Sequence, residues 1–392
     1  MDKSLLAKQM NNLKSESAFQ VLAKAKKLEA DGKNVIHFEI GEPDFDTPSN
    51  IVEAGKRALD EKYTHYTAAQ GMLPFREAIV DYAKKYKNIS TNPEEVVVVP
   101  GAKPIMYFTV TALINPGDEV ICPNPSFPIY ESLIRFVGGV PIPLHIKEEN
   151  EFRLDVEELK SKITSKTKLL IINSPANPTG GILTEEDIEG IADAVRGKNI
   201  FVLSDEIYDR IVYEGSAKSI ATMPGMKDWT IVLDGFSKTY AMTGWRLGYG
   251  IMNKELAHHI TKLIINSNSC TAAFTQMAGI EALKGPQDEV LRMIDEFKRR
   301  REIIVDGLNS IKGITCKKSP GAFYAFANIT GTGMKSSEMA DYLLEHAGVA
   351  VLSGSSFGSF GEGYIRLSYA TSLENINRGL ERINDAVEKL LK

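Results

Sequence analysis

The sequence predicts an α/β protein built on a mostly parallel central sheet with helices on both faces, joined to a smaller α+β domain. Between about residues 94 and 252, short runs of β-branched and apolar residues alternate with helical patterns. The runs are apolar throughout, as expected for parallel strands buried on both faces. From about residue 287, a long charged helical pattern precedes short strands and further helices, a mixture typical of an α+β domain.

The composition is that of a globular chain without extreme charge. The 392 residues are 43% apolar and 25% charged, with a net charge of -5. This length favours two or three domains, and the mild acidity disfavours nucleic acid as a partner. We expect no membrane segment or signal peptide, because no apolar run is long enough. Cys122, Cys270 and Cys316 are far apart, which disfavours disulfides and a metal site and favours the cytoplasm.

The elements expected along the chain begin with a polar, helical arm of about 30 residues. The stretch VIHFEIGEPDFDTP then predicts a strand that enters a Gly/Pro-rich loop. The strands expected in the sheet are EEVVVV, DEVICP, TKLLIIN, KNIFVLS and WTIVLD. We divide the chain into an arm with part of the small domain at 1–45, a large domain at 46–285 and a small C-terminal domain at 286–392.

The clearest helix signal is TEEDIEGIADAVRG. Thr184 is expected to cap its N-terminus with Asp187 at the third helical position, and Gly197 marks its end. In the C-terminal part, a charged helix is expected at about 287–309 and a last helix from about Leu373. Between them lie the strand patterns GITCKK, GAFYAFANI, VAVLSG and GYIRLSYA.

Four residues with chemical potential follow the predicted strands directly. Gly101 follows VVVVP, Asn177 follows LLIIN, Asp205 ends FVLS and Lys238 follows TIVLDGFS. In sheets of this kind, ligands bind beyond the carboxyl ends of the strands. We therefore expect these four residues to converge on one crevice.

Lys238 lies in the stretch DGFSKTYAMTGWRLGYG, a nearly uncharged loop after an apolar strand. Desolvation and nearby positive charge lower a lysine pKa and make the amine a nucleophile that can form a Schiff base. Arg246 would supply such a charge, and Gly244, Gly248 and Gly250 are expected to let the backbone turn tightly. A lone Ser-Lys pair is more often an ordinary exposed lysine, so its surroundings decide between the two interpretations.

Asp205 and Tyr208 lie one helical turn apart in SDEIYDRIVY. The carboxylate could balance a buried cation and the phenol could hydrogen-bond an oxyanion, but a helix cap and a packing tyrosine are the simpler interpretation. Asn177 lies in an Asn-Pro turn, which is first of all a turn signal. Arg366 lies inside the apolar strand pattern GYIRLSYA, where its fork suits either a ligand carboxylate or a structural ion pair.

Taken together, these candidate residues indicate a ligand more specifically than any one of them does. Gly101 and Ala102 add backbone N–H groups that could face an anion at the start of the following helix. A lysine that can form a Schiff base, a carboxylate, a phenol, an amide, an anion-binding turn and two arginines match the groups of pyridoxal phosphate. That cofactor carries an aldehyde, a ring nitrogen, a phenolic oxygen and a phosphate.

The ordered motifs NPTGG, SDEIYDRIVY, FSKTYAMTGWRLGYG and YIRLSYA resemble those of class I aminotransferases of fold type I, near the bacterial and archaeal aspartate aminotransferase branch. The resemblance covers essentially the whole chain. It implies transfer of an amino group from an L-α-amino acid to a 2-oxo acid by a ping-pong mechanism, with 2-oxoglutarate and glutamate as one expected pair. It also implies a homodimer with active sites at the subunit interface.

The resemblance implies roles around the ring of the cofactor. Lys238 would hold the aldehyde covalently and later move the proton between the amino-acid α-carbon and the cofactor. Asp205 would pair with the protonated pyridine nitrogen, and Tyr208 and Asn177 would hydrogen-bond the phenolic oxygen. Phe127 would stack on the ring, where many relatives have Trp or Tyr.

The resemblance also implies the phosphate and substrate contacts. Arg246, Ser237 and the turn Gly101-Ala102-Lys103 would hold the phosphate, and Tyr66 would reach it from the other subunit. The residues expected to bind the substrate are Gly41, Phe127, Asn177 and Arg366, with Arg366 on the α-carboxylate. One departure is Gly235, where relatives often have a serine, so we expect slightly weaker retention of the cofactor.

Three alternatives stay open at this stage. Another reaction of the same cofactor and fold, such as β-elimination, is the nearest. A non-enzymatic regulator that binds the cofactor would need a DNA-binding domain, for which about 30 residues before the fold leave little room. A nicotinamide- or nucleotide-binding protein would need one of two glycine-rich phosphate motifs after a strand, G-x-G-x-x-G or G-x-x-x-x-G-K-[ST]. Neither motif occurs in this sequence.

The substrate side chain is the least determined feature. A dicarboxylic substrate needs a distal cation, and the segment INSNSCTAAFTQ, which lies near the substrate in relatives, has no arginine or lysine. Lys103 could serve if its side chain points into the site. Aspartate, aromatic and branched-chain amino acids therefore all remain candidates.

Overall fold

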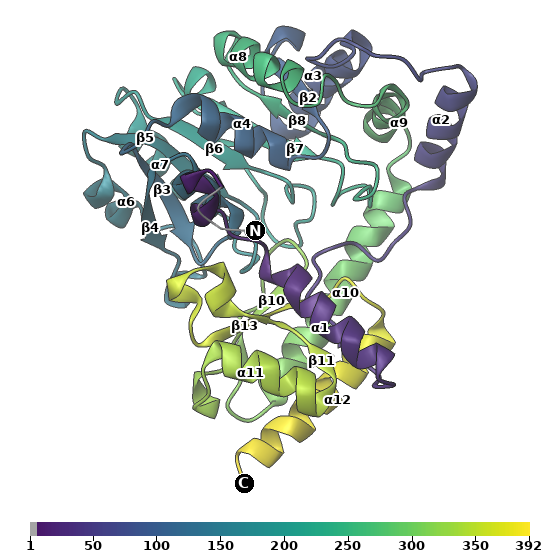
Figure 1. Cartoon of the computed structure of the whole chain (residues 1–392), viewed down its shortest axis with the longest axis vertical. Helices are drawn as coiled ribbons and strands as arrows, with labels where there is room; N and C mark the ends of the chain where they lie inside the picture. The colour runs from purple at the N-terminus through teal and green to yellow at the C-terminus, as the bar shows by residue number, and fades with distance from the viewer. Residues whose placement is uncertain (1–5) are drawn as a thin grey trace.

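The computed structural model describes residues 6–392 and is organised around a seven-stranded sheet (Figure 1). The strand order is β2-β8-β7-β6-β5-β3-β4. The strands are β2 (Val96–Val99), β3 (Glu119–Asn124), β4 (Val140–His145), β5 (Thr167–Asn173), β6 (Phe201–Asp205), β7 (Thr230–Gly235) and β8 (Gly248–Ile251). The pairs from β4 to β7 are parallel, and β8 runs antiparallel to both β2 and β7. The predicted α/β fold with a mostly parallel sheet is therefore confirmed.

Helices cover both faces of this sheet because its strands are apolar on both sides. In β5, Leu169 and Ile171 pack with one cluster of side chains, whereas Leu170 and Ile172 pack with another. The first cluster includes α4 and α8, and the second includes α6 and α7. The helices of this part are α2 (Ser49–Asp60), α3 (Leu73–Lys87), α4 (Lys103–Leu113), α5 (Ile129–Phe136), α6 (Val156–Lys162), α7 (Glu185–Val195), α8 (Lys254–Ile265) and α9 (Ala273–Lys284).

The start of α7 has the predicted cap. Thr184 Oγ1 accepts a hydrogen bond from the Asp187 backbone N–H at 3.1 Å, and Asp187 Oδ2 accepts one from the Thr184 N–H at 2.8 Å. Gly197 has a φ of 74° just after the helix, as a chain reversal there requires.

The expectation that Gly248 and Gly250 form tight turns is wrong. Both lie in β8, whose sequence GYGI does not look like a strand because glycine is depleted in strands and fills two of its four positions. Glycine is needed at 248 for close approach, since a β-carbon there would lie 2.5 Å from the backbone nitrogen of Ala102. The strand thus brings the start of α4 against the end of β7.

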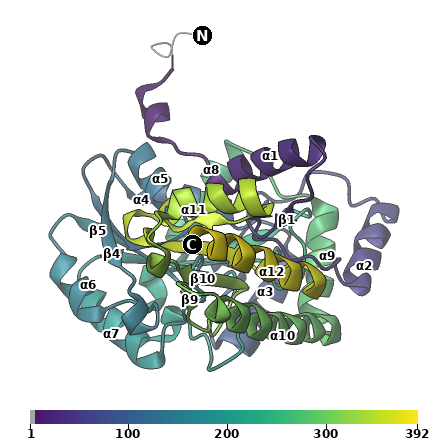
Figure 2. The same ribbon diagram turned by 90° about the horizontal axis from the view of Figure 1, so that it is seen from below.

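The C-terminal part forms a second layer below the large sheet (Figures 1 and 2). Its antiparallel sheet has the order β12-β13-β10-β9, and a separate parallel pair joins β1 to β11. The elements are β1 (Ile36–His37), β9 (Thr315–Cys316), β10 (Tyr324–Asn328), β11 (Val349–Ala350), β12 (Leu352–Ser353), β13 (Tyr364–Ser368), α10 (Asp288–Ser310), α11 (Ser336–Tyr342) and α12 (Leu373–Leu390).

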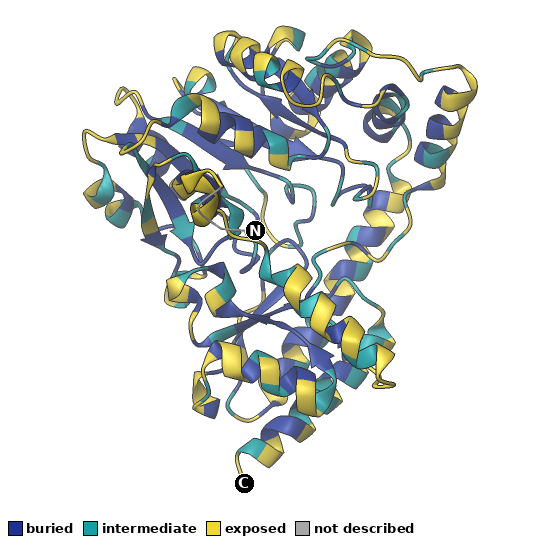
Figure 3. Cartoon of the chain, in the orientation of Figure 1, coloured by how far each residue is buried: buried dark blue, intermediate teal, exposed yellow. Residues whose placement is uncertain are grey.

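The N-terminal arm joins this second layer. Helix α1 (Ser17–Ala30) packs against the β11 and β12 region, with Ala25 fully buried among Val35, Leu344 and Ala350. A short 3-10 helix, Lys8–Asn12, precedes it. The burial pattern in Figure 3 shows buried strands between helices whose outer faces are exposed. Within residues 6–392, no helix is long and apolar enough to cross a membrane.

Candidate active site

A cavity of about 380 Å³ lies where the ends of β5, β6 and β7 meet the small layer and the arm. Most of the residues that the sequence singled out line it. Those that do are Gly41, Ala102, Lys103, Phe127, Asn177, Asp205, Tyr208, Ser237, Lys238, Arg246 and Arg366. Gly101 and Tyr66 are not among the lining residues. The expected convergence of strand ends on one crevice is therefore present.

Lys238 is half-buried and has no carboxylate partner within ion-pair distance among residues 6–392. Its Nζ donates a hydrogen bond to the Gly41 carbonyl at 2.5 Å. Its pKa is lowered to about 8, mainly by burial; the negative charge of Glu42 opposes the shift, and the positive charges of Arg366 and Lys103 contribute to it. The amine is thus poised as a nucleophile. The charge that we expected from Arg246 comes instead from these two residues.

Asp205 lies at the end of β6 and is buried. Tyr130 donates a hydrogen bond from its hydroxyl to Asp205 Oδ2 at 2.6 Å, and the Ile207 backbone N–H donates to Oδ1 at 3.3 Å. Burial raises the Asp205 pKa to about 6, although both hydrogen bonds lower it. A cation in the cavity would hold this group ionised.

Two residues that support Asp205 escaped the sequence analysis. Tyr130 comes from α5, three residues after Phe127, and its position in a helix gave no sign of a polar role. Asn173 donates from its amide to the Asp205 carbonyl at 3.0 Å and accepts from the Asn177 backbone N–H at 2.8 Å. Because Asn173 ends β5 next to β6, the rule of polar residues at strand ends could have found it.

Tyr208 is buried and shares a 2.7 Å hydrogen bond with the hydroxyl of Tyr324. Burial raises the pKa of both phenols, so both are neutral donors or acceptors near neutral pH. Tyr324, from β10, also accounts for the glycine at position 41, because a β-carbon there would lie 2.3 Å from the Tyr324 hydroxyl. The sequence analysis missed Tyr324 because its strand, GAFYAFANI, resembled ordinary core.

Two buried polar atoms of the cavity lining have no hydrogen-bond partner: Asn177 Oδ1 and Arg366 Nε. Arg366 donates from Nη2 to the Glu39 carbonyl and lies over the rings of Tyr324 and Phe357, at 4.7 and 5.3 Å. No carboxylate of residues 6–392 lies within ion-pair distance of it. Since an unpaired buried polar group costs about 1–3 kcal/mol, these atoms indicate a ligand, not a structural ion pair.

The other end of the cavity suits an anion. Helix α4 begins at Lys103 with no side-chain cap at Ala102, so its first N–H groups are unpaired within the helix. Gly101 has a φ of 82°, and a β-carbon there would lie 2.0 Å from Arg246 Nη2. Arg246 therefore lies directly against the turn, held by a 2.6 Å hydrogen bond from Nη1 to the Thr243 carbonyl.

Two predicted residues lie elsewhere. The Tyr66 side chain is 89% exposed in the single chain, between α2 and α3. Gly235 is buried in β7 and does not line the cavity. A β-carbon at 235 would lie 3.1 Å from the Gly248 Cα and the Leu247 carbonyl oxygen and 3.3 Å from Ile207.

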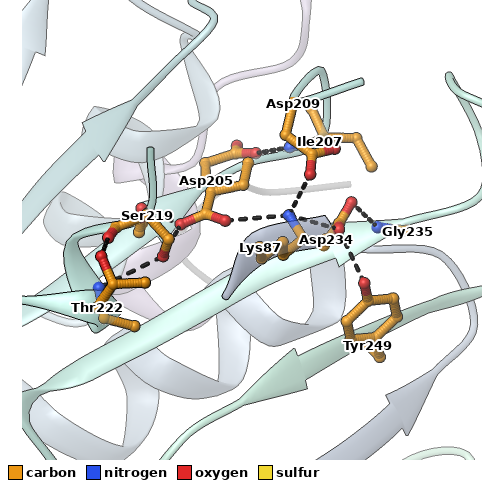
Figure 4. Close-up of polar contacts among 12 residues, drawn as sticks. Lys87, Asp205, Ile207, Asp209, Ser219, Thr222, Asp234, Gly235 and Tyr249 are labelled. Atoms are coloured by element: carbon orange, nitrogen blue, oxygen red, sulfur yellow. Dashed lines mark hydrogen bonds and ion pairs between the residues drawn. The ribbon is translucent and has the colours of Figure 1, made fainter. Parts of the chain in front are cut away.

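A second polar cluster lies just behind the cavity and was not foreseen (Figure 4). Lys87, at the end of α3, lies 3.0 Å from Glu206 Oε2, 2.5 Å from Asp209 Oδ2 and 2.9 Å from Asp234 Oδ2. Tyr249 donates to Asp234 at 2.8 Å. The cluster ties the turn after β6 to the end of β7. It thereby supports the backbone that carries Asp205 and Lys238.

The residues present fit pyridoxal phosphate. The cavity combines a low-pKa lysine, a buried carboxyl that needs a cation, two orphaned polar atoms and an anion cradle. Fold and site together define a pyridoxal-phosphate transferase of fold type I.

The comparisons with known proteins identify the family. The model of "Aminotransferase class I and II" matches residues 33–383, and the chain belongs to this family. It is similar to an aspartate aminotransferase of Pyrococcus horikoshii, with 42% identity over 98% of each chain. A probable aspartate/prephenate aminotransferase of Aquifex aeolicus is 41% identical, with 98% of this chain and 99% of that relative covered.

Solved structures agree with this assignment. Aspartate aminotransferase from Thermus thermophilus with maleate has a TM-score of 0.94 at 34% identity, covering 97% of this chain and 99% of that one. Aromatic aminotransferase from Pyrococcus horikoshii has a TM-score of 0.89 at 41% identity, covering 94% and 99%. The chain is therefore an aminotransferase that uses pyridoxal phosphate, as the motifs predicted, and family membership disfavours the alternatives considered above.

Proposed function

We propose that Lys238 binds the cofactor covalently and carries the proton during transamination. The observation that carries this assignment is the pKa of about 8 of a half-buried lysine with no carboxylate partner, at the end of the strand beside Asp205. Such an amine is neutral for an appreciable fraction of the time, as a nucleophile and a base must be. When bound, the cofactor supplies an aldehyde for the amino group and a ring that accepts electrons from the α-carbon.

The remaining residues would hold and tune the ring. Asp205 would take the protonated ring nitrogen as its missing cation, with Tyr130 fixing its carboxyl group and Asn173 its backbone carbonyl. Tyr208 and Asn177 would bind the phenolic oxygen, and Phe127 would cover one ring face. The orphaned oxygen of Asn177 supports a polar partner there, since the side-chain amide can be turned to present either atom.

The anion cradle would hold the phosphate. The backbone of Gly101-Ala102-Lys103 forms the start of α4, Arg246 lies against it, and Ser237 lines the same cavity. Tyr66 would join from a second subunit, because its hydroxyl is exposed in one chain and the family resemblance places it at the phosphate. This supports a homodimer with shared active sites.

Arg366 would bind the substrate α-carboxylate, with Gly41, Phe127 and Asn177 around the α-carbon. The unpartnered Nε and the aromatic floor of Tyr324 and Phe357 support a planar anion at this guanidinium. For one substrate pair we propose glutamate and 2-oxoglutarate, and for the location the cytoplasm, which the three free thiols favour.

The domain division also stays a proposal. Separate clusters of buried side chains in the large and small layers support units at about 46–285 and 286–392. The packing of α1 and β1 against the small layer supports 1–45 as an arm and part of the small domain, although residues 1–5 of that range lie outside the described part of the chain.

A screen of single half-reactions tests the function. The holoenzyme is mixed with one amino acid at a time, without an oxo acid, and its absorbance spectrum is followed. Conversion to the spectrum of the pyridoxamine form, with release of the matching 2-oxo acid, is the expected result. Release of ammonia in place of that conversion would point to elimination, and no spectral change with any amino acid would contradict the proposal.

A further inference from the structure

The arm places a carboxylate inside the cavity that none of the roles above uses. Glu16, the residue before α1, lines the cavity together with Ser17, Ala18 and Phe19. Its side chain is 17% exposed and forms an ion pair with Lys103. The pair therefore spans the cavity wall from the N-terminal arm to the start of α4.

Glu16 lies close enough to the reaction centre to act on it electrostatically. Burial is the main cause of the pKa shifts of Lys238 and Tyr324, and the negative charge of Glu16 raises both values. Lys103 lies over the Phe127 ring, at 5.3 Å from its centroid. The ion pair thus borders the space beside the Phe127 ring, where a substrate side chain would lie.

The side chain of Lys103 has no role in the proposed function, which uses only the backbone N–H of this residue. The lining contains four basic residues, Lys103, Lys238, Arg246 and Arg366. The last three are assigned to the cofactor aldehyde, the phosphate and the α-carboxylate. Among the described residues of this chain, Lys103 is therefore the cation left for a distal carboxylate of a substrate, and its ammonium already contacts Glu16.

We propose that Glu16 is a specificity-determining residue: it occupies Lys103 and thereby disfavours amino and oxo acids with a distal carboxylate relative to those with an uncharged side chain. This inference rests on the proposed function, in which glutamate and 2-oxoglutarate remain substrates but react more slowly than they would without the Glu16 charge. A dicarboxylate meets the repulsion of Glu16 and must displace it from Lys103, whereas an uncharged side chain leaves the pair intact. The apolar wall of Ile40, Met106 and Phe127 suits the second class.

The test measures half-reaction rates of the holoenzyme with aspartate, glutamate, phenylalanine and leucine. Glu16→Gln keeps the size of the side chain and removes its charge. It should raise kcat/KM for aspartate and glutamate by roughly five- to tenfold and leave phenylalanine and leucine within about twofold; the effect is modest because half of the Lys103 side chain is exposed. Equal changes in both classes, or no change, would overturn the inference.

Variants at Lys103 and Glu29 distinguish the effect of the Glu16–Lys103 ion pair from that of other charges. Lys103→Met should lower kcat/KM for the dicarboxylates more than for phenylalanine and leucine, because all substrates share the effect of the lost charge on Lys238. In the double variant Glu16→Gln/Lys103→Met, the selective gain produced by Glu16→Gln should disappear. Glu29→Gln removes a carboxylate from the same helix, away from the cavity, and should leave selectivity unchanged. A gain that persists without Lys103 would show that Glu16 acts on something other than this ion pair.

A binding measurement gives a readout that does not depend on turnover. Calorimetric titration with succinate, an unreactive dicarboxylate, should show roughly five- to tenfold tighter binding to Glu16→Gln, with 3-phenylpropionate unchanged. Unchanged succinate affinity would contradict the inference. If no amino acid is converted by any form of the protein, the proposed function fails instead, so the two failures are distinguishable.

Discussion

Lys87 and Lys238 both lie near the end of β7, one buried and one half-buried, and their surroundings differ. Lys87 touches three carboxylates, and their charges raise its pKa although burial alone would lower it. Lys238 has no such partner, and burial lowers its pKa to about 8. The same side chain is thus a fixed cation in one place and a nucleophile in the other. Burial alone does not identify a catalytic lysine; the absence of a counter-charge does.

The two regions also differ in how completely their polar atoms are paired. Around Lys87, both carboxylate oxygens of Glu206 and of Asp234 have partners: Lys87 itself and hydrogen bonds from Ser204, Ser219, Tyr249 and the Gly235 N–H. Of the six oxygens of the three carboxylates, Asp209 Oδ1 has no partner. The cavity leaves Asn177 Oδ1 and Arg366 Nε without partners. We interpret the first region as a support for the strand ends and the second as a site that a ligand completes.

The largest expected effect comes from exchanging the nucleophile. Lys238→Ala should lower kcat for transamination by more than about 10⁴-fold, because it removes both the covalent partner and the base. The protein should still bind the cofactor through the anion cradle, without the absorbance band of the covalent form. Spectra and initial rates of the purified variant check both statements. Appreciable activity in this variant would show that another lysine is the nucleophile.

Removal of the buried lysine should act on stability. Lys87→Met leaves three buried carboxylates without their cation and should lower the free energy of unfolding by about 3–5 kcal/mol. Denaturant unfolding of the apo-protein measures this, with Lys84→Met, at an exposed position of the same helix, as the control. Adding Asp234→Asn should restore part of the loss. Unchanged stability would mean that the cluster supports nothing.

The pKa difference between the lysines predicts a pH dependence. Only the neutral form of Lys238 reacts with the cofactor aldehyde, so the rate of cofactor capture by the apo-protein should rise with pH and level off above about 8. Between pH 7 and pH 9 the rise should be about tenfold. Stopped-flow absorbance measures it. A rate that keeps rising beyond pH 10 would indicate an ordinary lysine pKa.

The smallest expected effect concerns Gly235. Gly235→Ser restores the serine common in relatives, but its β-carbon would contact Gly248 and Leu247 closely. We expect cofactor affinity to tighten by less than about fivefold, with a stability loss below about 1 kcal/mol. Gly235→Ala separates the effect of the hydroxyl from that of the added carbon. A tenfold weaker affinity in the serine variant alone would contradict the expected phosphate contact.

The sequence predicts the parts of this molecule that local patterns determine. Strand ends in a parallel sheet converge by topology, so Asn177, Asp205 and Lys238 could be assembled without coordinates. Tyr130, Asn173 and Tyr324 could not, because their roles come from contacts between distant segments. The same holds for Lys87, which lies in the charged pattern KKYK and looks exposed. Gly248 was misread because a close backbone approach and a turn leave the same residue type.

The central claim is that Lys238, and not Lys87 or Lys103, carries the cofactor. Borohydride reduction of the holoenzyme makes the bond between cofactor and lysine permanent, and mass spectrometry of a proteolytic digest locates it. We predict one pyridoxyl group per chain on Lys238, with none after Lys238→Ala. Stoichiometric modification of any other lysine would contradict the account of this site.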